Sequence, residues 1–268
     1  VFRRQWQRVF SERATSGSII RPGRRRLYRS TANGIRGLKP PGDCRLKAEL
    51  RQTRQNTVPS NFKKQLIEAH YTSRVVPGRD SYDILDWGSR ESQLARFHIF
   101  VDVLIRNKMV GDQKKPCHVL DVGCGLSDLC SFMKRLNLDI DYTGVDIVPA
   151  IIAEAKRRYP ARKLVLADIF DAEPFAASAF DAAFISGTFN LEVGNNEAFV
   201  ALALAKMLPM VTDCLVANFL HTRASHKYDH CHYYDPGTII RAIAPQVQRV
   251  ELRDDYMEND FTLILWRR

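Results

Sequence analysis

The stretch that most restricts the fold of this chain is residues 117–136. An apolar strand pattern, residues 117–122, ends abruptly at Gly123-Cys124-Gly125. Apolar residues then recur at helical spacing: Leu129, Phe132, Met133 and Leu136. Glycine lets a backbone come close to a ligand, and the first turn of a helix offers unpaired N–H groups. A strand, a glycine turn and a helix in this order predict a nucleotide-type binding site.

Strand and helix patterns alternate through the rest of the chain, which predicts an α/β fold with a mostly parallel sheet. Further strands are predicted at 142–146, 163–167, 180–185, 211–219, 247–253 and 261–267. Helices are predicted between Pro149 and Pro160, over 197–208 and over 236–244. Only residues 254–260 separate the last two strands, too few for a parallel crossover. We therefore expect a final hairpin whose last strand is antiparallel.

Two segments precede this sheet, so the chain is divided into three parts. Residues 1–60 form a basic arm, residues 61–115 a helical lid segment, and residues 116–268 the main domain. In the lid segment, Ser89 is predicted to cap a helix that ends near Asn107.

The arm accounts for the positive net charge of the chain. It contains 15 Arg or Lys residues and three acidic ones, whereas the remainder is nearly neutral. Large apolar residues are sparse there, so we expect the arm to be disordered or weakly ordered. Three interpretations stay open: contacts with nucleic acid phosphates, an organellar transit peptide, or a solvated tail of little function.

Other compositional features favour a cytoplasmic protein without a membrane span. No apolar run approaches the roughly 18 residues that a spanning helix needs. The six cysteines form no CxxC pair and several lie in apolar patterns, as expected for reduced, buried thiols. Oligomeric state has no signature in the sequence.

The glycine turn departs from the dinucleotide pattern. A G-x-G-x-x-G site needs a third glycine, but Asp128 stands at that position. An acid, Asp121, instead precedes the first glycine by two residues, giving acid-x-G-x-G. With this motif and the terminal hairpin, residues from about 61 to 268 resemble the Rossmann-like (class I) S-adenosylmethionine-dependent methyltransferases, close to the bacterial small-molecule type.

The resemblance implies S-adenosyl-L-methionine as cofactor and assigns roles at the strand ends. Asp146, about 20 residues past the turn, is placed to accept the ribose hydroxyls, a feature shared with NAD sites. Asp168 is expected to accept from the adenine amino group. The full set of expected cofactor-binding residues is Asp121, Gly123, Cys124, Gly125, Asp146, Ile147, Asp168, Ile169, Ser186, Arg96 and Trp87.

Two of these residues come from the lid segment. Arg96 is suited to pair with the methionine carboxylate, because a guanidinium matches a carboxylate bidentately. The alternative for Arg96 is a solvated helix face, and for Trp87 plain packing.

The catalytic residues are not fixed by the sequence. His226, His230 and His232 lie in a polar loop and are candidates for a general base, although an ordinary surface loop is the alternative. Their spacing suits a metal only on a helix, which this loop does not resemble, so no metal is expected.

Together these features predict methyl transfer to an unidentified acceptor, most simply a small molecule. The alternatives are an NAD-dependent oxidoreductase on a Rossmann fold, and a non-catalytic nucleic-acid-binding protein that uses the basic arm.

Overall fold

The fold was analysed in a computed structural model of the chain. The structure describes residues 26–31, 34–35, 60–111, 115–171 and 174–268. Most of the basic arm therefore lies outside the described residues. None of the described helices is both long and apolar enough to cross a membrane.

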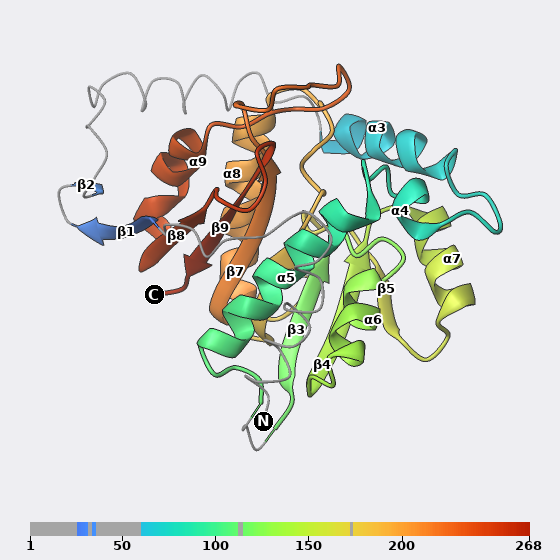
Figure 1. Cartoon of the computed structure of the whole chain (residues 1–268), viewed down its shortest axis with the longest axis horizontal. Coiled ribbons are helices and arrows are strands. Elements are labelled where there is room, and N and C mark those ends of the chain that lie inside the picture. The colour runs from blue at the N-terminus through green and yellow to red at the C-terminus, as the bar shows by residue number, and fades with distance from the viewer. Residues whose placement is uncertain (1–25, 32–33, 36–59, 112–114, 172–173) are drawn as a thin grey trace, which may run out of the picture.

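A nine-stranded sheet forms the centre of the molecule (Figure 1), in the order β2-β1-β8-β9-β7-β6-β3-β4-β5. The parallel strands are β3 (Cys117–Val122), β4 (Ile140–Asp146), β5 (Lys163–Leu166), β6 (Phe180–Ile185) and β7 (Val211–Leu220). Strand β9 (Asp260–Trp266) lies antiparallel between β7 and β8 (Arg249–Arg253). The predicted final hairpin and antiparallel last strand are confirmed.

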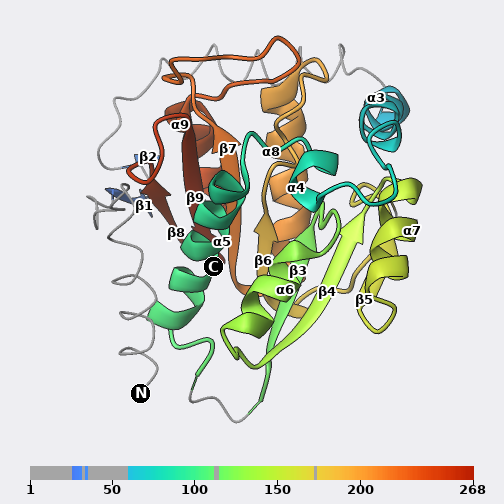
Figure 2. The same cartoon turned by 45° about the vertical axis from the view of Figure 1, so that its right-hand side comes forward.

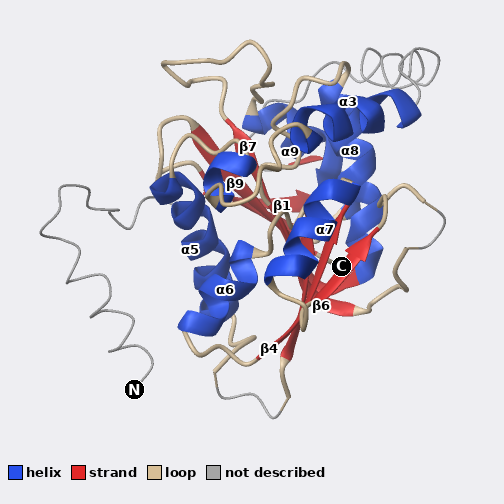
Figure 3. Cartoon of the chain, turned by 90° about the vertical axis from the view of Figure 1, so that its right-hand side faces the viewer, coloured by secondary structure: helices blue, strands red, loops and turns tan. Residues whose placement is uncertain are grey.

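Helices cover both faces of this sheet, and each face has its own apolar core. On one face lie α5 (Arg90–Arg106), α6 (Asp128–Arg135) and α7 (Pro149–Arg158), with Phe100, Leu129 and Ile151 among the buried residues. On the other lie α8 (Asn196–Met207) and α9 (Pro236–Ile243), with Leu204 and Ile240 buried. Figure 3 shows α5 and α6 on the opposite side of the sheet from α8 and α9. Short 3-10 turns, η1 (Leu208–Met210) and η2 (Ala244–Gln246), follow α8 and α9.

Two lid elements lie across the carboxyl ends of the parallel strands (Figure 2): α3 (Ser60–Thr72) and α4 (Ser81–Ile84). Helix α4 was not predicted, because four residues are too few for a visible apolar period. The predicted cap of α5 is confirmed, since the Ser89 side chain accepts a hydrogen bond from the Ser92 amide at 3.1 Å. Asp235 caps α9 in the same way through the Thr238 amide at 2.9 Å.

One segment of the arm is part of the sheet. Strand β1 (Arg26–Thr31) pairs antiparallel with β8 and extends the sheet, and β2 (Gly34–Ile35) pairs with β1. Local composition hid this strand, because its pairing partner lies more than 200 residues later in the sequence. The domain thus includes residues from the arm.

Candidate active site

A cavity of about 400 Å³ lies at the carboxyl ends of the parallel strands, beneath the lid. The loops after β3 and β6 meet there. Strand order reverses between these two neighbours, with β4 and β5 on one side and β7 on the other. Open α/β sheets bind ligands at this switch point.

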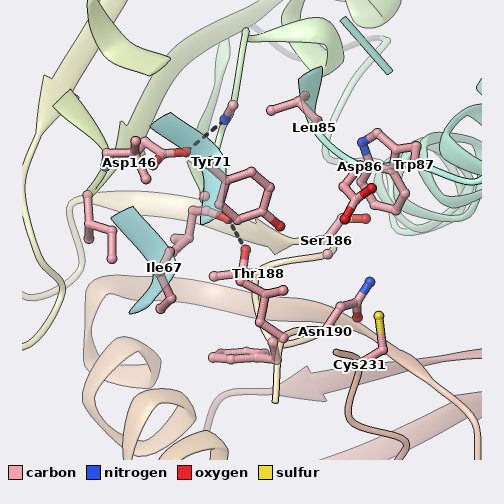
Figure 4. Close-up of a pocket in the computed structure, with 18 of the residues that line it drawn as sticks. Ile67, Tyr71, Leu85, Asp86, Trp87, Asp146, Ser186, Thr188, Asn190 and Cys231 are labelled. Atoms are coloured by element: carbon pink, nitrogen blue, oxygen red, sulfur yellow. Dashed lines mark hydrogen bonds between the residues drawn. The ribbon is translucent and has the colours of Figure 1, made fainter. Parts of the chain in front are cut away.

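The glycine turn after β3 forms one wall of the cavity. The amides of Gly123 and Cys124 both donate to the Val145 carbonyl, at 2.8 and 3.0 Å, which fixes the turn against β4. Gly123 has φ +67°, and a Cβ at this position would clash with the Thr188 hydroxyl. Thr188 itself donates to the Val122 carbonyl at 2.9 Å (Figure 4). The turn therefore requires glycine for two independent reasons.

Asp146 lines the cavity at the end of β4, as expected, and also organises the turn. Its two carboxylate oxygens accept from the Gly125 and Val148 amides, each at 3.0 Å. Burial raises the pKa of this carboxyl above its ordinary value, and the backbone hydrogen bonds oppose the rise. Ile147 lines the cavity beside it.

Asp168 and Ile169 extend the wall beyond β5. Asp168 accepts from the Phe170 amide at 2.9 Å, which holds the loop in an Asx-type turn. Both residues line the cavity, as does Ser186 after β6. The structure thus brings together residues from four strand ends that are far apart in the sequence.

The lid closes on two of the glycines. A Cβ on Gly125 would lie 2.7 Å from a methyl carbon of Leu85, and one on Gly187 would lie 2.8 Å from the Trp87 ring. Both glycines have positive φ. Lys63 of α3 donates to the Val193 carbonyl at 2.9 Å and also to Gly194, tying the lid to the loop before α8. The lid therefore packs directly on the turns that line the cavity.

Arg96 lines the cavity, but its charge is already matched. The guanidinium pairs with Asp260 and donates to Asn218 Oδ1 at 2.8 Å and to the Ser92 carbonyl at 2.9 Å. It is 3% exposed and Asp260 is fully buried, so the alternative of a solvated helix face is wrong. The guanidinium lies over the Trp87 ring, with 4.5 Å between Arg96 Cζ and the ring centroid. Arg96 thus links the lid, β7 and β9.

Asp121 and Cys124 do not line the cavity, contrary to the expectation of direct ligand contact. Asp121 is buried one position before the end of β3 and accepts from the Tyr142 hydroxyl at 2.7 Å. Burial raises its pKa to about 7, although the Tyr142 hydrogen bond opposes this rise. Burial likewise raises the pKa of the Cys124 thiol. Both side chains are buried and do not face the cavity.

The raised pKa of Asp121 predicts a pH-dependent stability. The folded protein holds this proton more tightly than an unfolded chain, whose value is near 3.8. The contribution of this carboxyl to stability is therefore greatest below about pH 4 and is lost as the pH rises through about 7. Asp121→Asn removes this titration, so the free energy of unfolding of the wild type should fall relative to that of the variant between pH 4 and 7. Urea titrations at several pH values measure it, and equal slopes would contradict the assignment.

Of the three histidine candidates, only His226 lines the cavity. His230 faces Asp86, 3.4 Å away, and stacks on His70. His232 lies between Glu192 and Glu197, at 2.7 and 3.0 Å, outside the cavity. A general base among these histidines stays a prediction. His226 is the candidate that remains, because it is the one of the three that lines the cavity.

Several lining residues gave no signal in the sequence. Asn190 and Cys231 come from loops without periodicity, and Ile67, Leu85 and Asp86 come from the lid. Figure 4 shows Asp146 on one side of the cavity and Ser186, Asn190 and Cys231 on the other. Only the tertiary fold places these residues together.

Comparisons with known proteins agree with this geometry. Residues 119–209 match the family model described as a methyltransferase domain. A Mycobacterium tuberculosis protein named "Putative methyltransferase Rv1506c" is 25% identical to this chain over 160 residues. The match covers 56% of this chain and 93% of the relative.

Two solved structures share the fold at low sequence identity. Magnesium protoporphyrin IX methyltransferase of Synechocystis, with bound S-adenosylmethionine, has a TM-score of 0.54 at 12% identity, covering 77% of this chain and 97% of the other. Geranyl diphosphate C-methyltransferase of Streptomyces coelicolor, bound to S-adenosylhomocysteine, has a TM-score of 0.53 at 12% identity, covering 79% and 100%. The chain carries a Rossmann-like methyltransferase domain and is an S-adenosylmethionine-dependent methyltransferase.

Proposed function

We propose that this enzyme transfers a methyl group to a small molecule. The observation that carries the proposal is the cavity at the switch point between β3 and β6. At about 400 Å³ it lies near the lower end of the ~300–1,000 Å³ typical of ligand pockets. Cofactor and acceptor must share this space, which favours a compact acceptor over a polymer. The two similar methyltransferases are named for the small molecules magnesium protoporphyrin IX and geranyl diphosphate.

The residues present suit S-adenosylmethionine. Gly123 and Gly125 line the cavity, so their backbone can contact the ligand. We assign Gly123 and Gly125 to the methionine part, Asp146 to the ribose hydroxyls, and Asp168 with Ile169 to the adenine. Ser186 and Trp87 are assigned to the methyl end. Arg96 is assigned a positioning role behind Trp87, because Asp260 already neutralises its guanidinium.

When bound, S-adenosylmethionine supplies an electrophilic methyl group, which bonds to a lone pair of the acceptor while the electrons of the breaking C–S bond remain on sulfur. The protein's part is to align the two molecules and exclude water. An acceptor hydroxyl also loses its proton as the new bond forms. We assign this proton to His226, which lines the cavity, and its removal to solvent.

The acceptor class is tested with S-adenosylmethionine that carries a tritiated methyl group. The purified protein is incubated with a cell extract separated into metabolite, RNA and protein fractions. We expect label only in the metabolite fraction, and much less of it with Gly123→Ala at limiting S-adenosylmethionine. Label confined to RNA or protein would contradict a small-molecule acceptor.

The cellular location stays a prediction. We expect action in the cytoplasm, or in an organelle if the start of the arm serves as a transit peptide. Nucleic acid contact through the arm depends on residues that lie mostly outside the described part of the chain.

A further inference from the structure

The side chain of Tyr71 enters the cavity from the last turn of α3. Figure 4 shows its ring between Asp146 on one side and Ser186 on the other. Its hydroxyl has no hydrogen-bond partner among the described residues, yet it is not one of the unpaired polar atoms that are closed off from the surface. The hydroxyl is therefore open to the cavity and free to meet a ligand.

Contacts on either side of Tyr71 hold its helix in place. Near the start of α3, Lys63 is bonded to the loop before α8. Just past the end of α3, Arg74 pairs with Asp86 at 2.7 Å. His70 pairs with the same carboxylate at 3.0 Å and packs edge-to-face on the Tyr71 ring. None of these contacts uses the Tyr71 hydroxyl, so the side chain is ordered while this group stays available, which lowers the entropic cost of binding to it.

The Tyr71 hydroxyl is neutral at physiological pH. Burial raises its pKa above the ordinary value, and the negative charges of Asp86 and Asp146 raise it further. The hydroxyl therefore keeps its proton and does not serve as a base. It offers a ligand the lone pairs of its oxygen, one O–H donor and the face of its ring.

The position of Tyr71 matches the sulfur of S-adenosylmethionine. In this cofactor the sulfur is bonded to C5′ of the ribose, and the ribose is assigned to Asp146. The methyl group on the sulfur is assigned to the end of the cavity at Ser186. Because Tyr71 lies between these two residues, the assignments place the sulfonium beside it.

A tyrosine at this position distinguishes a sulfonium from the neutral sulfur of the product. The face of an aromatic ring attracts a cation, and a hydroxyl oxygen accepts weak C–H···O contacts from a methyl group that a positive sulfur polarises. S-Adenosylhomocysteine has neither the charge nor the methyl group. Other groups near this end are already engaged, since Arg96 lies over the Trp87 ring and Arg74 neutralises Asp86.

We propose that Tyr71 contacts the sulfonium of bound S-adenosylmethionine and makes the enzyme select this methyl donor over S-adenosylhomocysteine. This rests on the proposed function, through the assignment of Asp146 to the ribose. Methyl transfer removes both the methyl group and the positive charge, so the contacts with Tyr71 are lost and release of the product is favoured.

Calorimetric titration of the full-length protein with S-adenosylmethionine and, separately, with S-adenosylhomocysteine tests this selection. The readout is the ratio of the two dissociation constants, product over donor. We expect Tyr71→Phe, which keeps the ring, to lower this ratio about two- to fivefold. Tyr71→Leu, which also removes the ring, should lower it about two- to fivefold further. The affinity of Tyr71→Phe for S-adenosylhomocysteine should stay within about twofold of the wild type.

Tyr82→Phe is the matched control, because it removes the same hydroxyl from another lid helix. Tyr82 lies in α4, is partly buried like Tyr71 and does not line the cavity. Its ratio should equal that of the wild type. Equal weakening of both ligands in Tyr71→Phe would overturn the proposal, because the residue would then have only a structural role. An unchanged ratio in Tyr71→Phe and Tyr71→Leu would overturn it as well.

Failure of the proposed function gives a different result. The ratio does not involve the acceptor, so the selection by Tyr71 can fail while label still enters the metabolite fraction, and the reverse. Absence of binding of both ligands to the wild type would overturn the methyl-donor site itself, and the selection with it.

Discussion

Replacing Gly123 with alanine is expected to weaken S-adenosylmethionine binding about ten- to hundredfold. The added Cβ meets the Thr188 hydroxyl, which would have to give up its bond to the Val122 carbonyl. The residue also has φ +67°, which costs a non-glycine residue on the order of 1–3 kcal/mol. Isothermal titration calorimetry measures the loss.

Gly78→Ala is the control for backbone strain outside the cavity. Gly78 has φ +81° but nothing lies within 4 Å of its Cβ position, and it does not line the cavity. This variant bears the backbone strain without the clash, so its affinity should equal that of the wild type. A Gly123→Ala protein that is folded and binds normally would show that the turn is not part of the cofactor site.

Replacing Arg96 with methionine is expected to lower the free energy of unfolding by about 3–5 kcal/mol. The substitution leaves the fully buried Asp260 carboxylate without its counter-charge, and removing one partner of a buried pair is strongly destabilising. Trp87 also loses the guanidinium on which it stacks, 4.5 Å away. Urea denaturation followed by tryptophan fluorescence gives the value.

Two further variants show whether burial is the cause. Arg79→Met breaks an exposed pair with Asp83, spaced i,i+4, and should cost no more than about 0.5 kcal/mol. Arg96→Met combined with Asp260→Asn removes both charges and should recover part of the stability. If Arg96→Met were as mild as Arg79→Met, the buried network would not hold the lid.

Local sequence patterns were enough to predict most of the fold. Strand β6 was predicted with its observed limits, because residues 180–185 form a short apolar run between turn signals. The caps at Ser89 and Asp235 also follow from local chemistry, since their side chains accept from amides three residues on. Strand β1 was missed because its arginine-rich sequence resembles an arm, and only pairing with β8 makes it a strand.

The sequence predicted those site residues that lie at the ends of strands. Asp146 is the last residue of β4 and reaches the cavity, whereas Asp121 lies within β3 and turns to Tyr142. Sequence spacing does not distinguish these two cases. The histidine loop shows the same limit, because side-chain direction there depends on contacts such as the one between His232 and Glu192.

The most direct test of the central claim is calorimetric titration of the full chain with S-adenosylmethionine. We expect binding in the micromolar range, lost in Asp146→Ala, because that carboxylate both orders the Gly125 turn and is assigned to the ribose. Asp141→Ala, on the same strand but exposed and outside the cavity, should bind as the wild type does. Absence of binding to the wild type at tens of micromolar, or equal affinity in Asp146→Ala, would contradict the account.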